Sequence, residues 1–265
     1  MKTFKKYLSI YLNIFKMSFM SEMTHKGNFL TWIAVHSISL LTLIIFFKLV
    51  YTNVAQINGW SQYQSLLVLG TGTLITGLGS LTFFPFMYGF SREIQKGEFD
   101  FKLAKPLNIL FQSAFRWVDI EDLIVTPNAI LLIIYSVLQL HPQNLLPNTI
   151  GYIVLLTSSM LFLFSILTLI QSLAFRFIQI NSVTDFYWSI VNITKYPAKA
   201  IKNVSQIALY ALVPLAIISS VPSEVLMGKW EPVWIIGSLT LAITSFIISR
   251  QVFMFSLRHY SSASS

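Results

Sequence analysis

The sequence predicts an all-α polytopic membrane protein, with six transmembrane helices preceded by an amphipathic helix at the membrane surface. Charged residues make up only 11% of the 265 residues, whereas 55% are apolar. A soluble domain contains about 25% charged residues, so this chain lacks the charge to cover a surface that faces water. Apolar runs of about 20 residues, the length needed to cross the hydrocarbon core, recur along the chain.

The first 28 residues combine lysines with apolar side chains at helical spacing. From Phe4 to Phe19 the apolar side chains recur every three or four residues, which places them on one face of a helix. A basic amphipathic helix lies in the membrane interface rather than crossing it. A signal peptide is the competing interpretation, but Asn13 and Lys16 interrupt its apolar region and no small-residue cleavage site follows. We therefore expect residues 1–28 to form an interfacial helix.

Residues 29–260 contain the six expected spans, followed by a short tail at 261–265. We expect the first two spans at residues 29–50 and 62–90, and a third span that ends near Leu140. The last three are expected at residues 150–175, 205–221 and 232–255. Residues 141–149 are expected to be a turn that contains two prolines.

The second span is rich in small residues. Thr73-x-x-x-Gly77 and Thr76-x-x-x-Ser80 fit the small-xxx-small pattern, which lets helices approach closely in lipid. Tight helix packing is therefore a better interpretation than a substrate path. Pro85 is expected to bend this helix just before the charged segment that follows.

Acidic residues precede the third span, at Asp119, Glu121 and Asp122. Carboxylates in a first helical turn interact favourably with the positive end of the helix dipole. Their expected role is capping rather than catalysis.

The basic residues are distributed very unequally between the two sides of the predicted membrane. With a cytoplasmic amino terminus and six spans, only Lys48 and Lys229 of the 18 basic residues lie outside. Positive residues favour the cytoplasmic side, so we expect both termini in the cytoplasm and the chain in the cytoplasmic (inner) membrane. The segment 176–204, including Lys195, belongs to that inner side. The net charge of +8 then faces anionic membrane lipid and not nucleic acid.

The most strongly charged stretch is residues 91–107, SREIQKGEFDFKLAKPL. Gly97 can end a helical turn, and a helix cannot continue through Pro106. The apolar residues between them, Phe99, Phe101 and Leu103, give the segment an amphipathic character. The pattern predicts a short element at the membrane surface that docks against a soluble partner. A solvated loop that merely joins two spans fits these residues equally well.

Motifs for catalysis are absent from the sequence. It lacks G-x-x-x-x-G-K-[ST], H-E-x-x-H and G-x-S-x-G, so it cannot bind ATP through a P-loop of its own. It also has no cysteine, which excludes disulfides and thiolate metal sites. We expect neither an enzyme nor a cofactor in this chain. His36 lies inside the first span, where an ionisable group is a functional candidate, although a neutral histidine bonded to a neighbouring helix is the more ordinary role.

The charged stretch 91–107 resembles the corresponding loop of the ABC-2 type permeases. More narrowly, it resembles that of their six-span viologen-exporter-like family, whose loop reads I-x-x-G-x-[LF]-D-x-x-L-x-[KR]-P. The matching residues are Ile94, Gly97, Phe99, Asp100, Leu103, Lys105 and Pro106. A second match comprises Lys195-Tyr196-Pro197, Leu212-Val-Pro-Leu-Ala216, Val221-Pro222 and Leu226-Met-Gly228. The resemblance covers essentially the whole chain and implies an ABC-2 (type V exporter-like) architecture.

The resemblance implies a half-transporter that dimerises with itself or with a sister permease. It would bind two copies of a separate ATPase subunit, which would hold ATP and Mg²⁺. Residues 91–118 would form the coupling loop that inserts into a groove on the ATPase. The contact candidates are Glu93, Glu98, Asp100, Lys102 and Lys105, with Gly97 and Pro106 shaping the turn. The candidates for the translocation path are His36, Tyr196, Pro197, Pro214 and Pro222.

The function expected from this resemblance is that of a permease subunit of an ABC transporter, an exporter of a hydrophobic or amphipathic compound. An ion-coupled secondary carrier is one alternative, and it would need acidic residues at the bilayer midplane or inverted repeats with broken helices. A membrane scaffold without transport activity is another, because its loops would look the same.

Overall fold

The computed structural model describes residues 2–57, 59–177, 181–197 and 218–260. Over these ranges the regular structure is helical, with no β-sheet. Five of the helical stretches are long and apolar enough to cross a membrane. The prediction of an all-α polytopic membrane protein is therefore confirmed. The expected fifth span, 205–221, lies largely outside the described residues.

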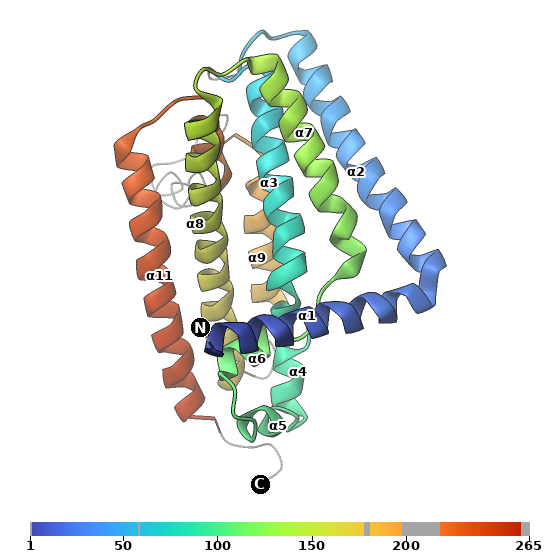
Figure 1. Cartoon of the computed structure of the whole chain (residues 1–265), viewed down its shortest axis with the longest axis vertical. Coiled ribbons are helices and arrows are strands. Elements are labelled where there is room, and N and C mark those ends of the chain that lie inside the picture. Colours follow the sequence, from blue (N-terminus) through green and yellow to red (C-terminus); the bar gives the residue numbers. More distant parts are fainter. Residues whose placement is uncertain (1, 58, 178–180, 198–217, 261–265) are drawn as a thin grey trace.

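Five long helices run roughly along the long axis of the molecule, with α3 packed against α7 and α8 packed against α11 (Figure 1). They are α2 (Lys26–Thr52), α3 (Gln62–Thr82), α7 (Val125–Leu140), α8 (Leu145–Ser172) and α11 (Pro232–Arg258). The shorter helices are α1 (Lys2–Glu22), α4 (Phe90–Gln95), α5 (Asp100–Leu103), α6 (Ile109–Ala114) and α9 (Asn181–Ile193). Four 3-10 turns, η1 (Met23–His25), η2 (Phe84–Met87), η3 (Ile120–Ile124) and η4 (Leu173–Phe175), join them, and residues 218–226 are also helical.

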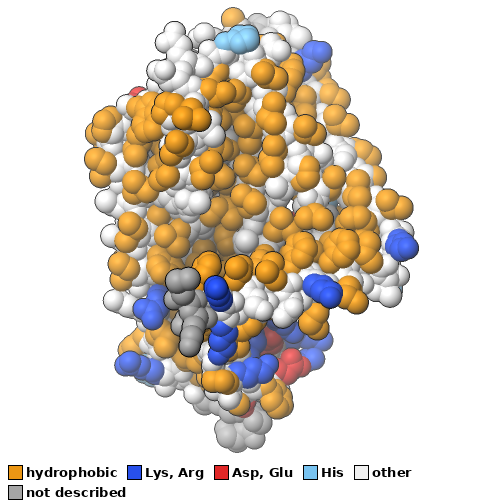
Figure 2. Space-filling model, viewed as in Figure 1, with side chains coloured by type: hydrophobic (Ala, Val, Ile, Leu, Met, Phe, Trp, Pro, Cys, Tyr) orange, Lys and Arg blue, Asp and Glu red, His pale blue; other side chains and the backbone are white. Residues whose placement is uncertain are grey.

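Polar and apolar ends of the molecule are clearly separated. α1 crosses the lower end of the bundle in Figure 1, and α4, α5 and α6 lie at the same end. Figure 2 shows basic side chains gathered over this end, while apolar side chains cover most of the rest of the visible face. Lys48, in the last turns of α2, and Lys229, just before α11, belong to the opposite end. A bilayer would therefore cover the apolar middle and leave the basic end in water.

The central helix of the bundle is α3, in which most residues are buried. A capping box begins it: Ser61 N donates to Gln64 Oε1 at 2.9 Å, and Gln64 N donates to Ser61 Oγ at 3.5 Å. Gly70 and Gly77, seven residues apart, lie on the face that meets α7. A Cβ on Gly77 would stand 2.5 Å from Thr126 Oγ1. The predicted tight packing is confirmed, and it depends on the absence of side chains at these glycines.

The second span is shorter than the sequence predicts. α3 ends at Thr82, and the chain continues as the 3-10 turn η2, with Pro85 at its start. Pro85 therefore does not bend a continuous helix to residue 90. Its missing N–H and fixed φ suit the first turn of a new helical segment instead. Gly89, with φ of 89°, then adopts a left-handed conformation immediately before α4.

The fourth span begins earlier than expected. α8 begins at Leu145 rather than near residue 150, so Pro147 lies in its first turn, where proline is tolerated. Asn148 holds this outer corner together. Its Nδ2 donates to Gln143 O at 2.8 Å, and its Oδ1 accepts from Trp230 Nε1 at 2.8 Å.

The sequence predicts that residues 176–204 stay on the same side as the charged segment 91–107, but the described part of residues 176–204 does not stay at that end of the molecule. α9 rises behind α3 and α8 (Figure 1). A Cβ on Gly72 would lie 2.7 Å from Thr194 O and 2.9 Å from Lys195 Cα. Gly72 is the central residue of α3, about 15 Å from either end at about 1.5 Å rise per residue. Residues 194 and 195 therefore pack against the middle of α3. Ser219 Oγ donates to Thr194 O at 2.5 Å, which places the helical residues 218–226 beside the end of α9.

The close approach at Gly72 yields a stability prediction. The Gly72→Ala methyl group would collide with backbone atoms, which cannot move away as a flexible side chain can. We expect Gly72→Ala to lower the free energy of unfolding by about 1–3 kcal/mol, measured by thermal unfolding in detergent. Gly237→Ala in α11 is the matched control, because a Cβ there meets nothing within 4 Å. Equal stability of the two variants would contradict the packing described here.

Candidate functional site

The charged segment after α3 folds as a compact unit on the lower end of the bundle. α4 ends at Gln95, and Gly97 then adopts φ of 72°, a left-handed conformation that disfavours any residue with a Cβ. α5 ends at Leu103, three residues before Pro106. Both punctuating residues therefore act as the sequence predicts: they limit α4 and α5 to short helices and bring the segment back toward the membrane at α6.

Phe99 anchors this segment, contrary to the expectation that it forms part of an exposed apolar face. Its side chain is 0% exposed. Its ring centroid lies 5.7 Å from that of Phe90, 5.4 Å from that of Phe175 and 5.2 Å from that of Tyr260. These aromatic pairs join the segment to the ends of α8 and α11, so movement of the segment would be transmitted to the spans.

Glu93 holds the same segment together electrostatically. It is 5% exposed, and its two carboxylate oxygens each lie 2.5 Å from a cation, Lys102 Nζ and Arg116 Nη1. Burial lowers the pKa of Lys102, and the hydrogen bond to Glu93 opposes that change. Glu93 and Lys102 form an internal ion pair in this structure, and their contact with a partner stays a prediction.

The outer tip of the segment carries the side chains that remain available. Phe101 is 73% exposed and Leu103 is 43% exposed. Glu98, Lys105 and Pro106 are exposed as well. We call these five residues the exposed tip. Asp100 is only partly exposed, and its Oδ1 accepts a hydrogen bond from Tyr260 OH at 3.1 Å.

α1 is tied to this end of the molecule by three hydrogen bonds. Asn108 N donates to Tyr7 OH at 3.1 Å, Val118 N donates to Ser18 Oγ at 3.1 Å, and Tyr11 OH donates to Leu81 O at 2.5 Å. The amino-terminal helix therefore supports the charged segment along its length.

The acidic residues before α7 do not cap that helix. The first turn of α7 contains no acidic residue. Asp119 accepts from Trp117 Nε1 at 3.1 Å, and Asp122 Oδ1 lies 2.7 Å from His36 Nε2. The capping prediction is therefore wrong for Asp119 and Asp122, because both carboxylates find side-chain partners instead.

Asp119 gives a pH-dependent prediction. Burial raises its pKa from 3.8 to about 6, so above pH 6 the ionised carboxylate costs the folded state free energy, a cost that is relieved as the pH falls toward 3.8. Asp119→Asn keeps an acceptor for Trp117 and removes this cost. We expect it to raise the free energy of unfolding by about 1–2 kcal/mol at pH 7.5 and to lose most of that advantage only near pH 4, where the carboxylate is largely protonated in both states. Thermal unfolding at both pH values is the measurement. An advantage independent of pH would contradict the burial of Asp119.

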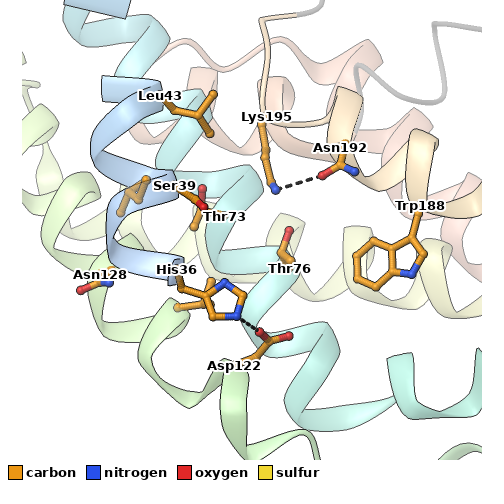
Figure 3. Close-up of a pocket in the computed structure, with 12 residues that line it drawn as sticks. His36, Ser39, Leu43, Thr73, Thr76, Asp122, Asn128, Trp188, Asn192 and Lys195 are labelled. Atoms are coloured by element: carbon orange, nitrogen blue, oxygen red, sulfur yellow. Dashed lines mark hydrogen bonds and ion pairs between the residues drawn. The ribbon is translucent and has the colours of Figure 1, made fainter. Parts of the chain in front are cut away.

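A cavity of about 270 Å³ lies at membrane depth between α2, α3, α7 and α9 (Figure 3). Its polar lining comes from six different parts of the fold. The residues are His36, Ser39, Thr73, Thr76, Asp122, Asn128, Asn192 and Lys195. Lys195 and His36 point into it from opposite sides, from beyond α9 and from α2 (Figure 3). The lining therefore contains a cationic, an acidic and an imidazole side chain in an otherwise apolar bundle.

The predicted path residues are not all in this cavity. His36 lines it, bonded to Asp122. The ring of Tyr196 lies 6.1 Å from that of Phe47, and Pro197 and Pro222 are buried. Pro214 lies outside the described residues.

Sequence reasoning missed Lys195 and Asp122 as cavity residues. A count of positive charges assigns each lysine between two spans to a loop, and it does not register that a polar segment can return to membrane depth. Polar backbone and side chains occur at such depth where they are buried in protein or line a cavity. The nearest sequence signal was the placement of Lys195 two residues before Pro197, a position where a helix must break.

The bundle of apolar helices, with a charged segment at one end and a polar cavity between the helices, is that of a polytopic membrane protein. A family model described as ABC-2 family transporter protein matches residues 37–264. The chain belongs to this family of ABC-2 transporter proteins. No curated protein and no solved structure matches the chain.

Proposed function

We propose that the chain is the permease subunit of an exporter driven by ATP hydrolysis on a separate ATPase subunit. Membership of the ABC-2 family supports a permease and an ATPase partner. The observation that carries the coupling role is the exposed tip. Phe101 and Leu103 are apolar side chains left in water, on a segment fixed from inside by Phe99 and Glu93. A rigid segment with an apolar and charged tip is suited to transmit movement of a docked partner.

The assembly that follows contains two ATPase subunits and a second permease, either another copy of this chain or a sister permease. ATP and Mg²⁺ would be held by the ATPase, since this sequence has no P-loop. Closure of the ATPase pair would move the charged segment, and through the aromatic contacts of Phe99 would move α8 and α11. The cargo that the apolar spans favour is hydrophobic or amphipathic, carried outward.

The test is a tagged pull-down from the native membrane in a detergent that preserves a known transporter complex. An ATPase subunit in stoichiometric amount supports the proposal, and a second permease would define the dimer.

Lys105→Glu reverses a charge at the exposed tip and should reduce ATPase recovery, because charge reversal opposes docking. Lys229→Glu, at the opposite end, is the control. Asp100→Arg should also uncouple transport, although it additionally breaks the bond to Tyr260. Recovery of the wild-type chain alone would refute the proposal.

The orientation in the inner membrane, with both termini cytoplasmic, has its own prediction. The native chain contains no cysteine, so single-cysteine variants report one site each. Gln143 and Lys105 are both exposed, at opposite ends of the bundle. We expect a cysteine at Gln143 to react with an impermeant maleimide in intact cells, and a cysteine at Lys105 to react only after the membrane is opened. The reverse pattern would overturn the orientation.

A further inference from the structure

Lys195 is a cation at an unusual depth. It lies beside the central residue of α3, and a transmembrane helix of this length matches a hydrocarbon core of about 30 Å. Lysine at such depth is costly, and it faces a cavity or a partner where it occurs. The cavity between α2 and α9 is the space that the Lys195 ammonium enters (Figure 3).

The charges around that cavity are unevenly partnered. Asp122 directs its Oδ1 to His36 Nε2 at 2.7 Å, on the α2 side. Lys195 Nζ donates to Asn192 Oδ1 at 3.0 Å, a neutral amide. Within the described ranges Lys195 forms no ion pair. An ammonium has three N–H donors, so donors remain for an anion that enters the cavity.

An apolar cleft adjoins the cavity. It has a volume of about 720 Å³ and shares Leu40 and Asn128 with the cavity lining. It runs between α2 and α7 toward the end of the molecule opposite the charged segment, where Lys48, Gln62 and Tyr63 also line it. Its apolar walls are Leu40, Leu41, Ile44, Leu66, Leu131 and Leu132. Phe47 is the one buried residue of α2, so this helix packs only loosely against its neighbours and the cleft beside it stays open. A polar cavity that continues into an apolar cleft matches a molecule with a polar head and an apolar body.

We propose that this cavity binds the anionic head group of an amphipathic molecule, a phosphate or carboxylate, through the ammonium of Lys195. The apolar body of the ligand lies in the cleft between α2 and α7. This proposal rests on the proposed export function, whose cargo it specifies. The ligand is either a membrane lipid or an exported amphiphile, since both have this chemistry.

The first experiment measures binding to the full-length wild-type chain in phosphatidylcholine nanodiscs, without the ATPase. The probes are dodecyl phosphate, dodecanol and dodecylamine, which share one apolar body and differ in the charge of the head. We expect dodecyl phosphate to bind about tenfold or more tightly than dodecanol, as a charge-assisted hydrogen bond allows, and dodecylamine to bind most weakly. Equal binding of the three probes would overturn the proposal without any variant.

Two substitutions should act in opposite directions. Lys195→Met removes the cation and should weaken dodecyl phosphate binding about tenfold, with little effect on dodecanol. Asp122→Asn removes the negative charge from the same cavity while its Oδ1 still accepts from His36, so it should tighten binding of dodecyl phosphate. Lys195→Arg keeps the charge and should retain binding, and Lys229→Met is the remote control. If misfolding caused the loss of dodecyl phosphate binding, binding of dodecanol would fall as well. Lys195→Met and Asp122→Asn would then both weaken binding instead of acting in opposite directions. Unchanged phosphate binding in Lys195→Met would refute the proposal.

A final arm distinguishes the two sources of the ligand. Phosphatidylglycerol added to the nanodiscs should displace dodecyl phosphate if the site serves membrane lipid, and should leave it bound if the site serves an exported amphiphile. Either result supports an amphipathic-anion site that depends on Lys195. The pull-down of the ATPase is independent of these measurements, so loss of phosphate selectivity with intact ATPase recovery would reject this site and leave the permease function standing.

Discussion

Phe99→Ala is expected to destabilise the protein by about 3–5 kcal/mol, the usual cost of removing a buried aromatic ring. The side chain is 0% exposed and contacts the rings of Phe90, Phe175 and Tyr260. Without it the charged segment should detach from the ends of α8 and α11. Thermal unfolding of the purified chain measures the stability. Trypsin cleavage after Lys96 and Lys102, which should become faster, reports on the segment itself.

Phe101→Ala is the matched control, two residues away in the same segment. Phe101 is 73% exposed, so its removal should change the free energy of unfolding by less than about 0.5 kcal/mol. It should instead reduce the amount of ATPase recovered in the pull-down, because exposed aromatic side chains are frequent anchors of interfaces. An equal loss of stability in both variants would contradict the division of the segment into an inner anchor and an outer tip.

Glu93→Ala is expected to cost about 3 kcal/mol, because it leaves the largely buried ammonium of Lys102 without its counter-ion, whereas the exposed Arg116 can be solvated. Lys102 and Arg116 each lie 2.5 Å from a Glu93 carboxylate oxygen. Glu98→Ala, five residues away, removes an exposed carboxylate and should change stability by less than about 0.5 kcal/mol. Thermal unfolding of the two variants at low salt makes the comparison.

A double variant tests the cause of the Glu93 effect. If the loss comes from the unpaired charge, removing Lys102 as well should restore part of the stability, so Glu93→Ala with Lys102→Met should be more stable than Glu93→Ala alone. The interaction energy of such a cycle isolates the pair from other effects of each substitution. A double variant whose losses simply add would show that Glu93 acts through packing and not through its charge.

Some elements of the fold were predictable because they depend on local sequence. Apolar runs predict membrane helices, since the free energy of transfer to lipid adds up residue by residue. Gly97 and Pro106 predict the breaks in the charged segment, because each constrains its own backbone. The interfacial character of residues 1–28 remains a prediction, as α1 is seen without a bilayer. The second span, in contrast, was drawn too long, because apolar residues continue past Thr82 into a 3-10 turn that hydropathy cannot distinguish from a helix.

The site depended on contacts that no local pattern encodes. Phe99, Glu93 and Asp100 looked alike from the sequence, as parts of one amphipathic docking element. The structure buries the first two and bonds the third to Tyr260, which is 160 residues away. Their burial depends on which helix ends meet them, and that is a property of the packed bundle.

By itself, the sequence determined the class of the protein, the composition of its spans and the charged segment that identifies its family. The tertiary structure alone decided the depth of Lys195 and its cavity. Charge counting placed this lysine in cytoplasmic water because it follows a polar segment. Gly72, which has no side chain, lets residues 194 and 195 pack against the middle of α3, and a close backbone approach between distant segments is settled only by three-dimensional packing.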